Sequence, residues 1–555
     1  MFVDVLDAAS QLFTLETMML MAAGTFGGLL AGSIPGFTIT MAIVLTLPFT
    51  FGMSPIQGLA TMISVMVGGL SGGLMSGMLT GIPGTPSSIA TTFDGFPLVR
   101  KGKPGLALGI GVWASFFGGI FSSIVLVLLA PQLANIGLEF GPWDYFSLVL
   151  FALTITASLS NGSLVKGLIA GALGLLVACI GTDDLNGVER FTFGTEFLVD
   201  GFDFLPVLIG LFAFSQLLGD LSDKKKAKEP LMKNPGQATK INHFAAISQV
   251  LSSWVNLCRS SVIGVFTGIL PAAGSSISNV LAYDQAKKAS KEKDEFGKGH
   301  PDGIIAPEAA NNATAGGSLI SMMALGIPGD VVTAVMLGAL MVHNIVPSPG
   351  FISEQPVLAN GIFIAFFIAH FFMVALQSLC LKAFVQVTRV PMYTLASVIL
   401  LYCSVGVFSL NNLEADIWTL FIFGMVGFVL KGLGFPLAPM ILGVVLGHIA
   451  EINFSRALST DSNLMVFITR PWSLFFIILA LFSSCFPLYQ KGKSISATWA
   501  PYFMPIMLFS LSIPLFMMDG YIRSVIGVFI VLMGIYNIYQ HRKNRVMFNK
   551  EVTNA

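Results

Sequence analysis

Uncharged, mostly apolar stretches follow one another along nearly the whole chain, separated by short polar segments. The first runs without a charged side chain from Thr17 to Phe93. Later ones include 104–138, 145–165, 260–283, 309–329, 355–381, 432–450 and 524–541. Many match the roughly 20 residues that an α-helix needs to cross a bilayer. The pattern predicts an all-α polytopic membrane protein with roughly 12–14 membrane segments, whereas a β-barrel would alternate in short strands.

The composition agrees with a membrane protein. Of the 555 residues 54% are hydrophobic and only 10% are charged, against about 25% charged in an ordinary soluble chain. The formal net charge is zero, so nothing indicates nucleic-acid binding. The five cysteines form no CxxC pair and the six histidines lack metal-ligand spacing, so we expect no cofactor and no metal framework. The first residues also lack the basic region of a cleaved signal peptide.

The loops between the apolar stretches predict an orientation, because Lys and Arg collect on the cytoplasmic side. The segment 220–240 carries six lysines, and 541–545 reads HRKNR. The segment 181–203 is acidic, with Arg190 as its only base. We therefore expect the N-terminus on the outer side of the membrane and the C-terminus on the cytoplasmic side.

An internal repeat is visible in the spacing of glycine and proline. Gly28, Gly32 and Pro35 recur 236 residues later at 264, 268 and 271. The motif Gly81-Ile82-Pro83-Gly84 recurs 245 residues later at 326–329. The nine-residue difference fits an insertion within 287–303. The two ordered pairs predict a duplication, with a first transport repeat at 1–110 and a second at 259–356.

The flanking segments predict that the two copies point in opposite directions across the membrane. An acidic segment precedes the first copy, and the lysine-rich loop precedes the second. The first copy ends in the basic loop 100–103, whereas the second ends in 343–356, which has no Lys or Arg. Inverted repeats with broken helices are typical of secondary transporters, whose binding sites lie at the breaks.

The Pro-Gly breaks predict the binding site itself. A break inside the bilayer leaves backbone groups unpaired, which is tolerated only in a protein interior or a wet cavity. A helix that resumes after a break presents free N–H groups and a positive dipole end, and so attracts anions. Small polar residues follow the breaks, and two adjacent amides lie further on. The predicted substrate-binding residues are Pro35, Gly36, Gly84, Thr85, Ser87, Ser88, Thr91, Ser275, Ser276, Asn311, Asn312 and Gly329.

Other interpretations of these features stay open. Glycines at every fourth residue, as at 24–36 and 69–81, usually mean close helix packing. Pro83 and Pro328 could be simple kinks, and Ser and Thr in membrane helices often bond back to their own chain. The functional interpretation rests on the recurrence of breaks and hydroxyls together.

Three acidic residues are candidates for coupling to a cation. Asp94 and Asp330 lie near the two GIPG motifs, and Glu308 begins the run Glu308-Ala-Ala-Asn-Asn. An ionisable residue in a membrane segment is a candidate site by default. Sodium is the candidate metal ion, and its ligands are unknown. As alternatives, Pro307 and Glu308 start a helix that Glu308 caps at the membrane edge, and Asp94 lies at the interface.

The motifs resemble the large membrane subunit of the tripartite tricarboxylate transporters (TctA type). The similar pieces are GGLLAGSIPG at 27–36, GIPGTPSSIATTFDGFPLVRKGKPGLALG at 81–109, GKGHPDGIIAPEAANNATAGG at 297–317, LGIPGDVVTAVMLGALMVH at 325–343 and LGVVLGHIAE at 442–451. The resemblance implies uptake of tricarboxylates or related organic acids across a bacterial inner membrane, driven by a sodium or proton gradient. The outer side is then the periplasm, where the N-terminus is expected. It also implies two partners, a small four-helix membrane subunit and a periplasmic solute-binding protein that delivers the carboxylate substrate.

The remaining ranges are expected to support the two repeats. They are connecting helices and a cytoplasmic loop at 111–258, C-terminal helices at 357–490, and extra helical segments with a cytoplasmic tail at 491–555. One departure from the family pattern is Pro271-Ala272, where Pro-Gly is usual. The sequence contains no P-loop motif, so nothing indicates that this chain uses ATP as its energy source. The alternatives are an intramembrane lipid-modifying enzyme or a passive anion channel, and the sequence does not name the substrate.

Overall fold

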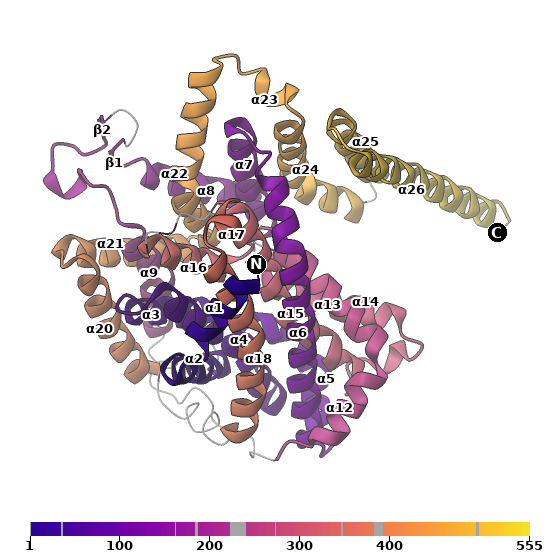
Figure 1. Cartoon of the computed structure of the whole chain (residues 1–555). Coiled ribbons are helices and arrows are strands. Elements are labelled where there is room, and N and C mark those ends of the chain that lie inside the picture. Colours follow the sequence, from indigo (N-terminus) through magenta and orange to yellow (C-terminus); the bar gives the residue numbers. More distant parts are fainter. Residues whose placement is uncertain are drawn as a thin grey trace. The chain divides into compact units, whose positions relative to one another are not determined.

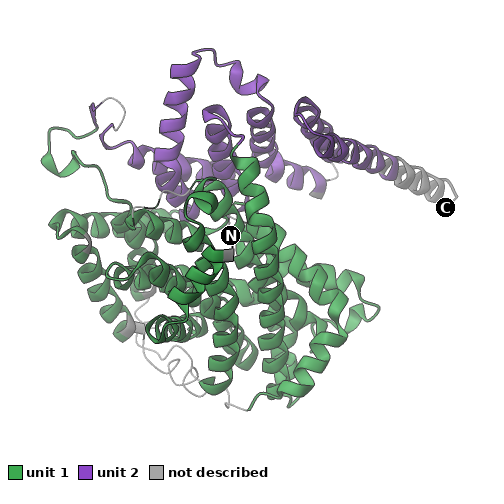
Figure 2. Cartoon of the chain, viewed as in Figure 1, with its two compact units in different colours: residues 1–138, 191–433 green, residues 139–190, 434–555 purple. Residues whose placement is uncertain are grey.

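The computed structural model describes residues 2–34, 37–160, 163–183, 187–222, 240–271, 273–343, 345, 348–381, 392–495 and 499–554. Pro35 and Gly36 lie outside the described residues, as does most of the lysine-rich loop. The chain divides into two compact units, each built from two stretches of sequence (Figure 2). Unit 1 comprises residues 1–138 and 191–433, and unit 2 comprises residues 139–190 and 434–555.

Unit 1 is helical and contains both predicted repeats (Figure 1). Its elements up to residue 138 are α1 (Phe2–Leu12), α2 (Leu15–Ser33), α3 (Ile39–Thr50), α4 (Pro55–Thr80), the 3₁₀ turn η1 (Pro86–Ser88), α5 (Ile89–Arg100) and α6 (Pro104–Gly137). The later ones are η2 (Glu196–Leu198), α9 (Phe204–Ile209), the π-helical turn η3 (Gly210–Phe214), α10 (Ser215–Ser222), α12 (His243–Ser252), α13 (Trp254–Ile269), α14 (Gly274–Ala289), η4 (Lys293–Glu295), α15 (Asp302–Leu325), α16 (Val331–Val342), α17 (Phe351–Glu354), α18 (Pro356–Leu379), α20 (Met392–Asn411) and α21 (Glu414–Gly432).

Unit 2 is smaller and also mainly helical. It contains α7 (Pro142–Leu159), α8 (Leu164–Ala178), the strands β1 (Gly181–Thr182) and β2 (Glu189–Arg190), α22 (Leu437–Thr460), α23 (Val466–Thr469), α24 (Pro471–Ser494), α25 (Ala500–Met517) and α26 (Tyr521–Asn554). The two short strands pair antiparallel. An ion pair between Arg190 and Glu451 joins β2 to α22.

The helices confirm an all-α polytopic membrane protein. Within the described residues, ten helices are long and apolar enough to cross a membrane. The shorter apolar helices are Ile39–Thr50, Leu164–Ala178, Phe204–Gly219, Val331–Val342 and Ala396–Ser409. α4 is buried along its whole apolar length, and nearly every residue of α15 is buried as well. These two helices therefore form the centre of unit 1, and each of them ends at the GIPG motif of its repeat.

The same contacts recur in both copies at the shifts that the sequence predicts. A side chain at Gly32 of α2 would collide with the carbonyl of Gly69 in α4. At Gly268 of α13 it would collide with the carbonyl of Thr314 in α15. Likewise, a side chain at Gly72 would meet the carbonyl of Leu29, and one at Gly317 would meet the carbonyl of Val265. The two glycines are 245 residues apart, and the two carbonyls are 236 apart. The duplication is therefore structural: α2 packs on α4 as α13 packs on α15.

The direction of α15 follows from its contacts with α6. Ser115 of α6 bonds Glu308, and Ser122 lies against Gly316. The order of contacts is the same along both helices, so α6 and α15 run parallel.

The helix α4 runs the other way. Gly111, near the start of α6, lies against Met78 near the end of α4. Ser71, earlier in α4, bonds Asn312, which lies midway between the two α15 residues that contact α6. Because α4 is antiparallel to α6, it is antiparallel to α15, and the two repeats are inverted.

The glycine ladders serve packing. Side chains at Gly24, Gly28 and Gly32 would meet backbone carbonyls of α4. Those at Gly73 and Gly77 would meet the segment that follows the first break. This close backbone approach is the role that small residues have in membrane helices, so the packing interpretation of the ladders is confirmed at these positions.

Candidate functional site

Both central helices end at a GIPG motif in the same way. Gly81 closes α4 with φ +79°, and its N–H bonds the carbonyl of Gly77. Gly326 closes α15 with φ +69° and bonds Met322. This left-handed conformation strains any residue with a Cβ, so glycine is required at both ends. The helical backbone is interrupted at both motifs, as the sequence predicts.

The last glycine of each motif is held against the preceding hairpin. A Cβ on Gly84 would collide with the carbonyl of Gly32 and the Ser76 hydroxyl. A Cβ on Gly329 would collide with the carbonyl of Gly268 and the Ser321 hydroxyl. Each pair is again related by the repeat shifts. These two glycines therefore fix the place where the next helix starts.

The helices that resume after the breaks are capped by different residues. In the first repeat Thr85 precedes η1, and its N–H bonds the Ser88 hydroxyl at 3.4 Å. That hydroxyl donates to the Thr85 carbonyl at 2.9 Å. In the second repeat Asp330 precedes α16 and exchanges equivalent bonds with Thr333. A neutral hydroxyl and a carboxylate thus occupy equivalent positions.

The two capping residues differ in their ability to carry a negative charge. Asp330 accepts from the Thr333 N–H at 2.8 Å and from the Ser318 hydroxyl at 3.1 Å. Its carboxyl group lies at the positive dipole end of α16, which favours the ionised form. In the first repeat the Thr85 hydroxyl bonds the Ser87 hydroxyl at 3.0 Å, and both are buried. The first half-helix start therefore carries hydroxyls and no intrinsic anion.

Glu308 connects the two repeats in the interior of unit 1. Its carboxylate accepts a 2.6 Å bond from Thr91 of α5 and a 2.8 Å bond from Ser115 of α6. Asn279 of α14 donates to the Thr91 hydroxyl, and its side-chain oxygen accepts from the Ala90 N–H. Glu308 is fully buried. Hydroxyls and amides from both repeats therefore surround one carboxylate.

One sequence-based alternative for Glu308 is wrong. Helix α15 begins at Asp302, so Pro307 and Glu308 lie inside the helix rather than in its first turn. A helix-capping role at the membrane edge does not apply to a fully buried side chain in the second turn. The helix starts earlier than predicted because Gly303, Ile304 and Ile305 continue to bond back to the 300–301 turn.

Asn311 and Asn312 connect the two central helices. The Asn311 side chain donates to the Leu70 carbonyl at 2.9 Å. Asn312 accepts from the Ser71 hydroxyl at 2.9 Å and donates to the Glu308 carbonyl at 3.2 Å. The side-chain oxygen of Asn311 is buried and has no hydrogen-bond partner among the described residues. The adjacent amides therefore lie beside the Glu308 network.

Asp94 has a dense set of donors. It accepts from the backbone N–H groups of Gly297, Gly299 and His300 at 2.7–3.0 Å. It also accepts from the Tyr283 hydroxyl at 2.9 Å. Asp94 is fully buried within the protein, and its position relative to the membrane surface stays a prediction. It attaches α5 of the first repeat to the loop between α14 and α15.

The remaining predicted residues are less closely associated. Ser275 is half-buried and Ser276 is exposed, both in the first turn of α14. Ser278, two residues on, is buried and bonds Thr314 at 2.7 Å. No group of three or more His, Cys, Asp or Glu residues that could hold a metal occurs in the described part of the chain.

Several residues of this network were not predicted from the sequence. They are Ser71, Ser115, Asn279, Tyr283 and Gln377. Ser71, Ser115 and Gln377 lie inside long apolar helices. Asn279 and Tyr283 lie on α14, which also carries charged side chains. A usable signal was the presence of Asn279 and Gln377 within long uncharged stretches, since buried amides need partners.

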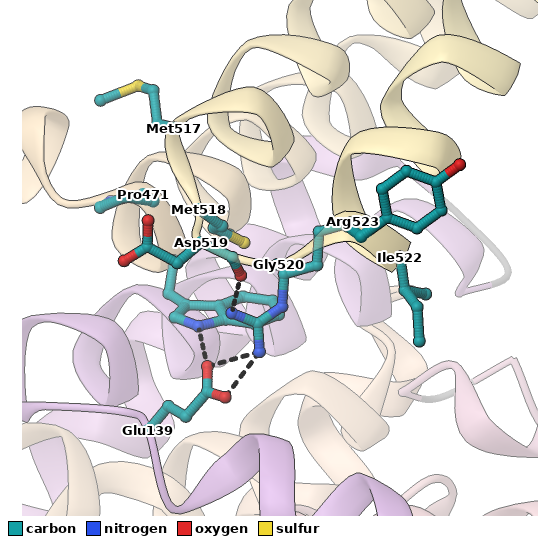
Figure 3. Close-up of a pocket in the computed structure, with 10 residues that line it drawn as sticks. Glu139, Pro471, Met517, Met518, Asp519, Gly520, Ile522 and Arg523 are labelled. Carbon is teal, nitrogen blue, oxygen red and sulfur yellow. Dashed lines mark hydrogen bonds and ion pairs between the residues drawn. The ribbon is translucent and has the colours of Figure 1, made fainter.

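A separate surface pocket of about 790 Å³ lies in unit 2. Arg523 bonds Glu139 at 2.6 Å, and the Trp472 ring N–H donates to the same carboxylate (Figure 3). Hydrogen bonding from Arg523 holds the pKa of Glu139 below its usual value. None of the residues that line this pocket is among those predicted from the breaks.

Comparisons with known proteins are consistent with these features. A family model described as the tripartite tricarboxylate transporter TctA family matches residues 18–442. The chain is 32% identical over 459 residues to an uncharacterized 52.8 kDa protein in the TAR-I ttuC′ 3′ region of Agrobacterium vitis, which covers 81% of this chain and 88% of that protein. An uncharacterized protein in the TAR-II ttuC′ 3′ region of the same organism is 34% identical over 209 residues, 38% of this chain and 86% of that protein. No solved structure matches.

Proposed function

Because the chain belongs to the tripartite tricarboxylate transporter TctA family, we propose that it is the large membrane subunit of a cation-driven importer of tricarboxylates or related organic acids. The observation that carries this proposal is the pair of equivalent breaks at the ends of two antiparallel central helices. Inverted repeats with discontinuous helices are the architecture on which secondary transporters build substrate and ion sites.

The breaks supply donors for a carboxylate substrate. The first one is followed by three buried hydroxyl residues, Thr85, Ser87 and Ser88. Hydroxyls and N-terminal amides of a helix bind anions, and the substrate is a polyanion. Asn311 and Asn312 add amides in the layer between α4 and α15.

Energetics favour coupling to a cation. Moving one negative charge inward against 100 mV costs roughly 2.3 kcal/mol, so a polyanion needs positive charges that move with it. Glu308 is a fully buried carboxylate to which only neutral groups donate hydrogen bonds. Such a group favours the binding of a proton or a monovalent cation. We take Glu308 as the first choice among the three acidic candidates, because Asp94 and Asp330 accept backbone N–H bonds.

The partners follow from the family. Its members are components of tripartite transporters, so we expect a small membrane subunit and a periplasmic solute-binding protein. The substrate then enters from the periplasm, and the basic loops face the cytoplasm of a bacterial cell.

The decisive experiment is reconstitution. The chain is co-expressed with the small membrane subunit from its gene neighbourhood and placed in vesicles, and the binding protein is added with labelled citrate. We expect citrate to accumulate above its external concentration when a proton or sodium gradient is imposed. A passive channel would only equilibrate citrate, and a lipid-modifying enzyme would move none.

Topology is tested separately. In a variant without the five native cysteines, single cysteines at Gln57 and Lys293 occupy corresponding loops of the two repeats. We expect a membrane-impermeant thiol reagent to label Gln57→Cys from the periplasm and Lys293→Cys from the cytoplasm. Labelling of both from one side would contradict the predicted orientation.

A further inference from the structure

The Glu308 carboxylate has no charged partner in the described structure. Its two oxygens accept from Thr91 and Ser115, and Asn311 lies beside it one turn further along α15. All three are neutral. An ionised carboxylate without a counter-charge is unfavourable in a dry interior, so the resting network favours a neutral Glu308.

The helices packed on α15 bring no compensating charge to this carboxylate. α4, α6 and α16 contain no titratable side chain. The charged groups of α5 are Asp94 and Arg100, of which Asp94 is held by the 297–300 loop. On α13, Arg259 bonds the side chain of Asn256, and Cys258 is the other titratable group.

The remaining neighbouring elements also provide no partner of opposite charge for Glu308 in the described structure. On α14 the titratable residues are Tyr283, Asp284, Lys287 and Lys288. The first donates to Asp94, and Asp284 pairs with Lys288. Glu354 of α17 and Asp330 before α16 carry the same sign as Glu308. No described ion pair includes Glu308, so only an added cation would neutralise it.

The geometry distinguishes a proton from a larger cation. The hydroxyls of Thr91 and Ser115 contact the two carboxylate oxygens directly, at 2.6 and 2.8 Å. These are hydrogen-bond distances, at which both hydroxyls donate to an ionised carboxylate. A metal ion would require both hydroxyls to move away and turn their lone pairs inward. A proton needs no such movement.

The third polar group beside this carboxylate is the side chain of Asn311, one turn further along α15, which acts on Glu308 as a donor. Its side-chain oxygen is buried and has no hydrogen-bond partner among the described residues. A proton on Glu308 therefore neutralises a carboxylate whose neighbours are all neutral, and it does so without displacing any of them.

We propose that Glu308 is the proton carrier of this transporter. This deepens the proposed function and rests on it for the transport step alone. A proton from water forms an O–H bond at one Glu308 oxygen, and that bond breaks when the proton returns to water on the other side. No other bond changes.

Protonation of Glu308 would change a contact between the two repeats. Thr91 belongs to the helix that follows the first break, and Glu308 belongs to the central helix of the second repeat. Charge-assisted hydrogen bonds are roughly twice as strong as neutral ones. The contact between α5 and α15 is therefore stronger when Glu308 is ionised and weaker when it is protonated, which links the proton to the arrangement of the two repeats.

The test is infrared difference spectroscopy on the purified full-length chain, between acidic and alkaline buffers in the absence of sodium and substrate. We expect a C=O band of a protonated carboxylic acid that disappears at alkaline pH. The isosteric variant Glu308→Gln should lose this band. Asn311→Leu and Thr91→Val should keep the band at a shifted frequency, because each removes one hydrogen bond of the carboxyl group.

The matched control is Ser123→Ala. Ser123 is buried on α6, as Ser115 is, but its hydroxyl bonds the carbonyl of Gly119 in its own helix. This variant should give the wild-type band. A Glu308→Gln spectrum identical to wild type would overturn the proposal, as would removal of the band by sodium at constant pH.

Transport is measured on the same variants to separate this inference from the proposed function. In vesicles with the partner subunits, Glu308→Gln should lose acceleration of uptake by an imposed pH gradient. If the infrared band titrates but the vesicles take up no carboxylate, the proton site is supported and the proposed function is refuted. Full proton-driven uptake by Glu308→Gln would refute the proton carrier and retain the transporter. If Glu308→Gln does not fold, an unshifted band in Asn311→Leu and Thr91→Val overturns the proposal.

Discussion

The two breaks of the inverted repeat share a backbone and differ in charge. Gly81 and Gly326 end the central helices with the same left-handed conformation. Thr85 and Asp330 then occupy equivalent capping positions, one as a hydroxyl and the other as a carboxylate. A duplicated fold has thus kept its geometry while the chemistry at one end has diverged.

This difference assigns unequal roles to the two helix starts. The start of α16 already has an acidic side chain of the protein itself, and Asp330 accepts from the Thr333 N–H. The start of η1 has buried hydroxyls and no carboxyl group at its cap, whereas Glu308 contacts Thr91 one turn later, in α5. An anionic substrate gains from a positive dipole end only where no carboxylate already lies, so we expect the substrate to approach the first break.

The largest effect is expected where the two breaks are alike. Gly84→Ala and Gly329→Ala each place a Cβ against a backbone carbonyl that is fixed in a packed helix pair. Overpacking of this kind costs about 1–3 kcal/mol or more. Both variants should show a lower melting temperature and a lower yield of monodisperse protein, to a similar extent.

Gly27→Ala is the control for this pair. Gly27 lies on α2, and a Cβ there would meet nothing within 4 Å. It should melt as wild type or slightly higher, since alanine favours helix. Wild-type stability of either break variant would mean that the tight contacts do not hold the breaks in place.

The second prediction makes the first break resemble the second. Thr85→Asp should retain the fold, because Asp is among the best helix N-caps and the equivalent position already has one. Like charges brought together cost several kcal/mol, so affinity for citrate should fall about tenfold or more. Titration calorimetry measures this, with Thr85→Ser as the conservative control. Normal citrate affinity in Thr85→Asp would place the substrate elsewhere.

Much of the fold was predictable because membrane helices leave strong signals. Uncharged runs of bilayer length, the GIPG recurrence and the opposite charge of the flanks depend on local sequence alone. The structure confirms the all-helical class and the duplication, with the residue shifts of 236 and 245 reproduced at Gly32 and Gly268. Pro307 was taken as a residue of the first turn, whereas α15 begins at Asp302 and tolerates this proline further inside the helix.

The site was less predictable because its contacts are distant in sequence. Glu308 and Thr91 are 217 positions apart, and Glu308 and Ser115 are 193 apart. A single Ser within an apolar helix is ordinary, and no periodicity marks Ser115 as the partner of a carboxylate. The sequence therefore indicated Glu308 as a candidate and left its surroundings unknown.

The third prediction separates two neighbouring hydroxyls of the first break. Ser88 exchanges two bonds with the Thr85 backbone, so Ser88→Ala should lower stability by about 1 kcal/mol through loss of the cap. Ser87 bonds only the Thr85 hydroxyl among the described residues, so Ser87→Ala should change stability by less than about 0.5 kcal/mol and weaken citrate binding. Denaturation and calorimetry on both variants measure this. Equal losses of stability would show that both serines are structural.

The smallest effect is expected at the second break, from Asp330→Asn. Asn is as good an N-cap as Asp, and it retains an oxygen to accept from the Thr333 N–H. The free energy of unfolding should therefore change by only a few tenths of a kcal/mol, since the lost charge contributes about 0.3–1 kcal/mol with the helix dipole and burial of that charge opposes it. Because Asp330 accepts backbone bonds whereas Glu308 does not, uptake by Asp330→Asn should keep the wild-type dependence on the pH gradient. If Asp330→Asn instead loses that dependence while Glu308→Gln retains it, the coupling proton binds at the second break. The acidic side chain that distinguishes this break would then serve proton coupling and not only helix capping.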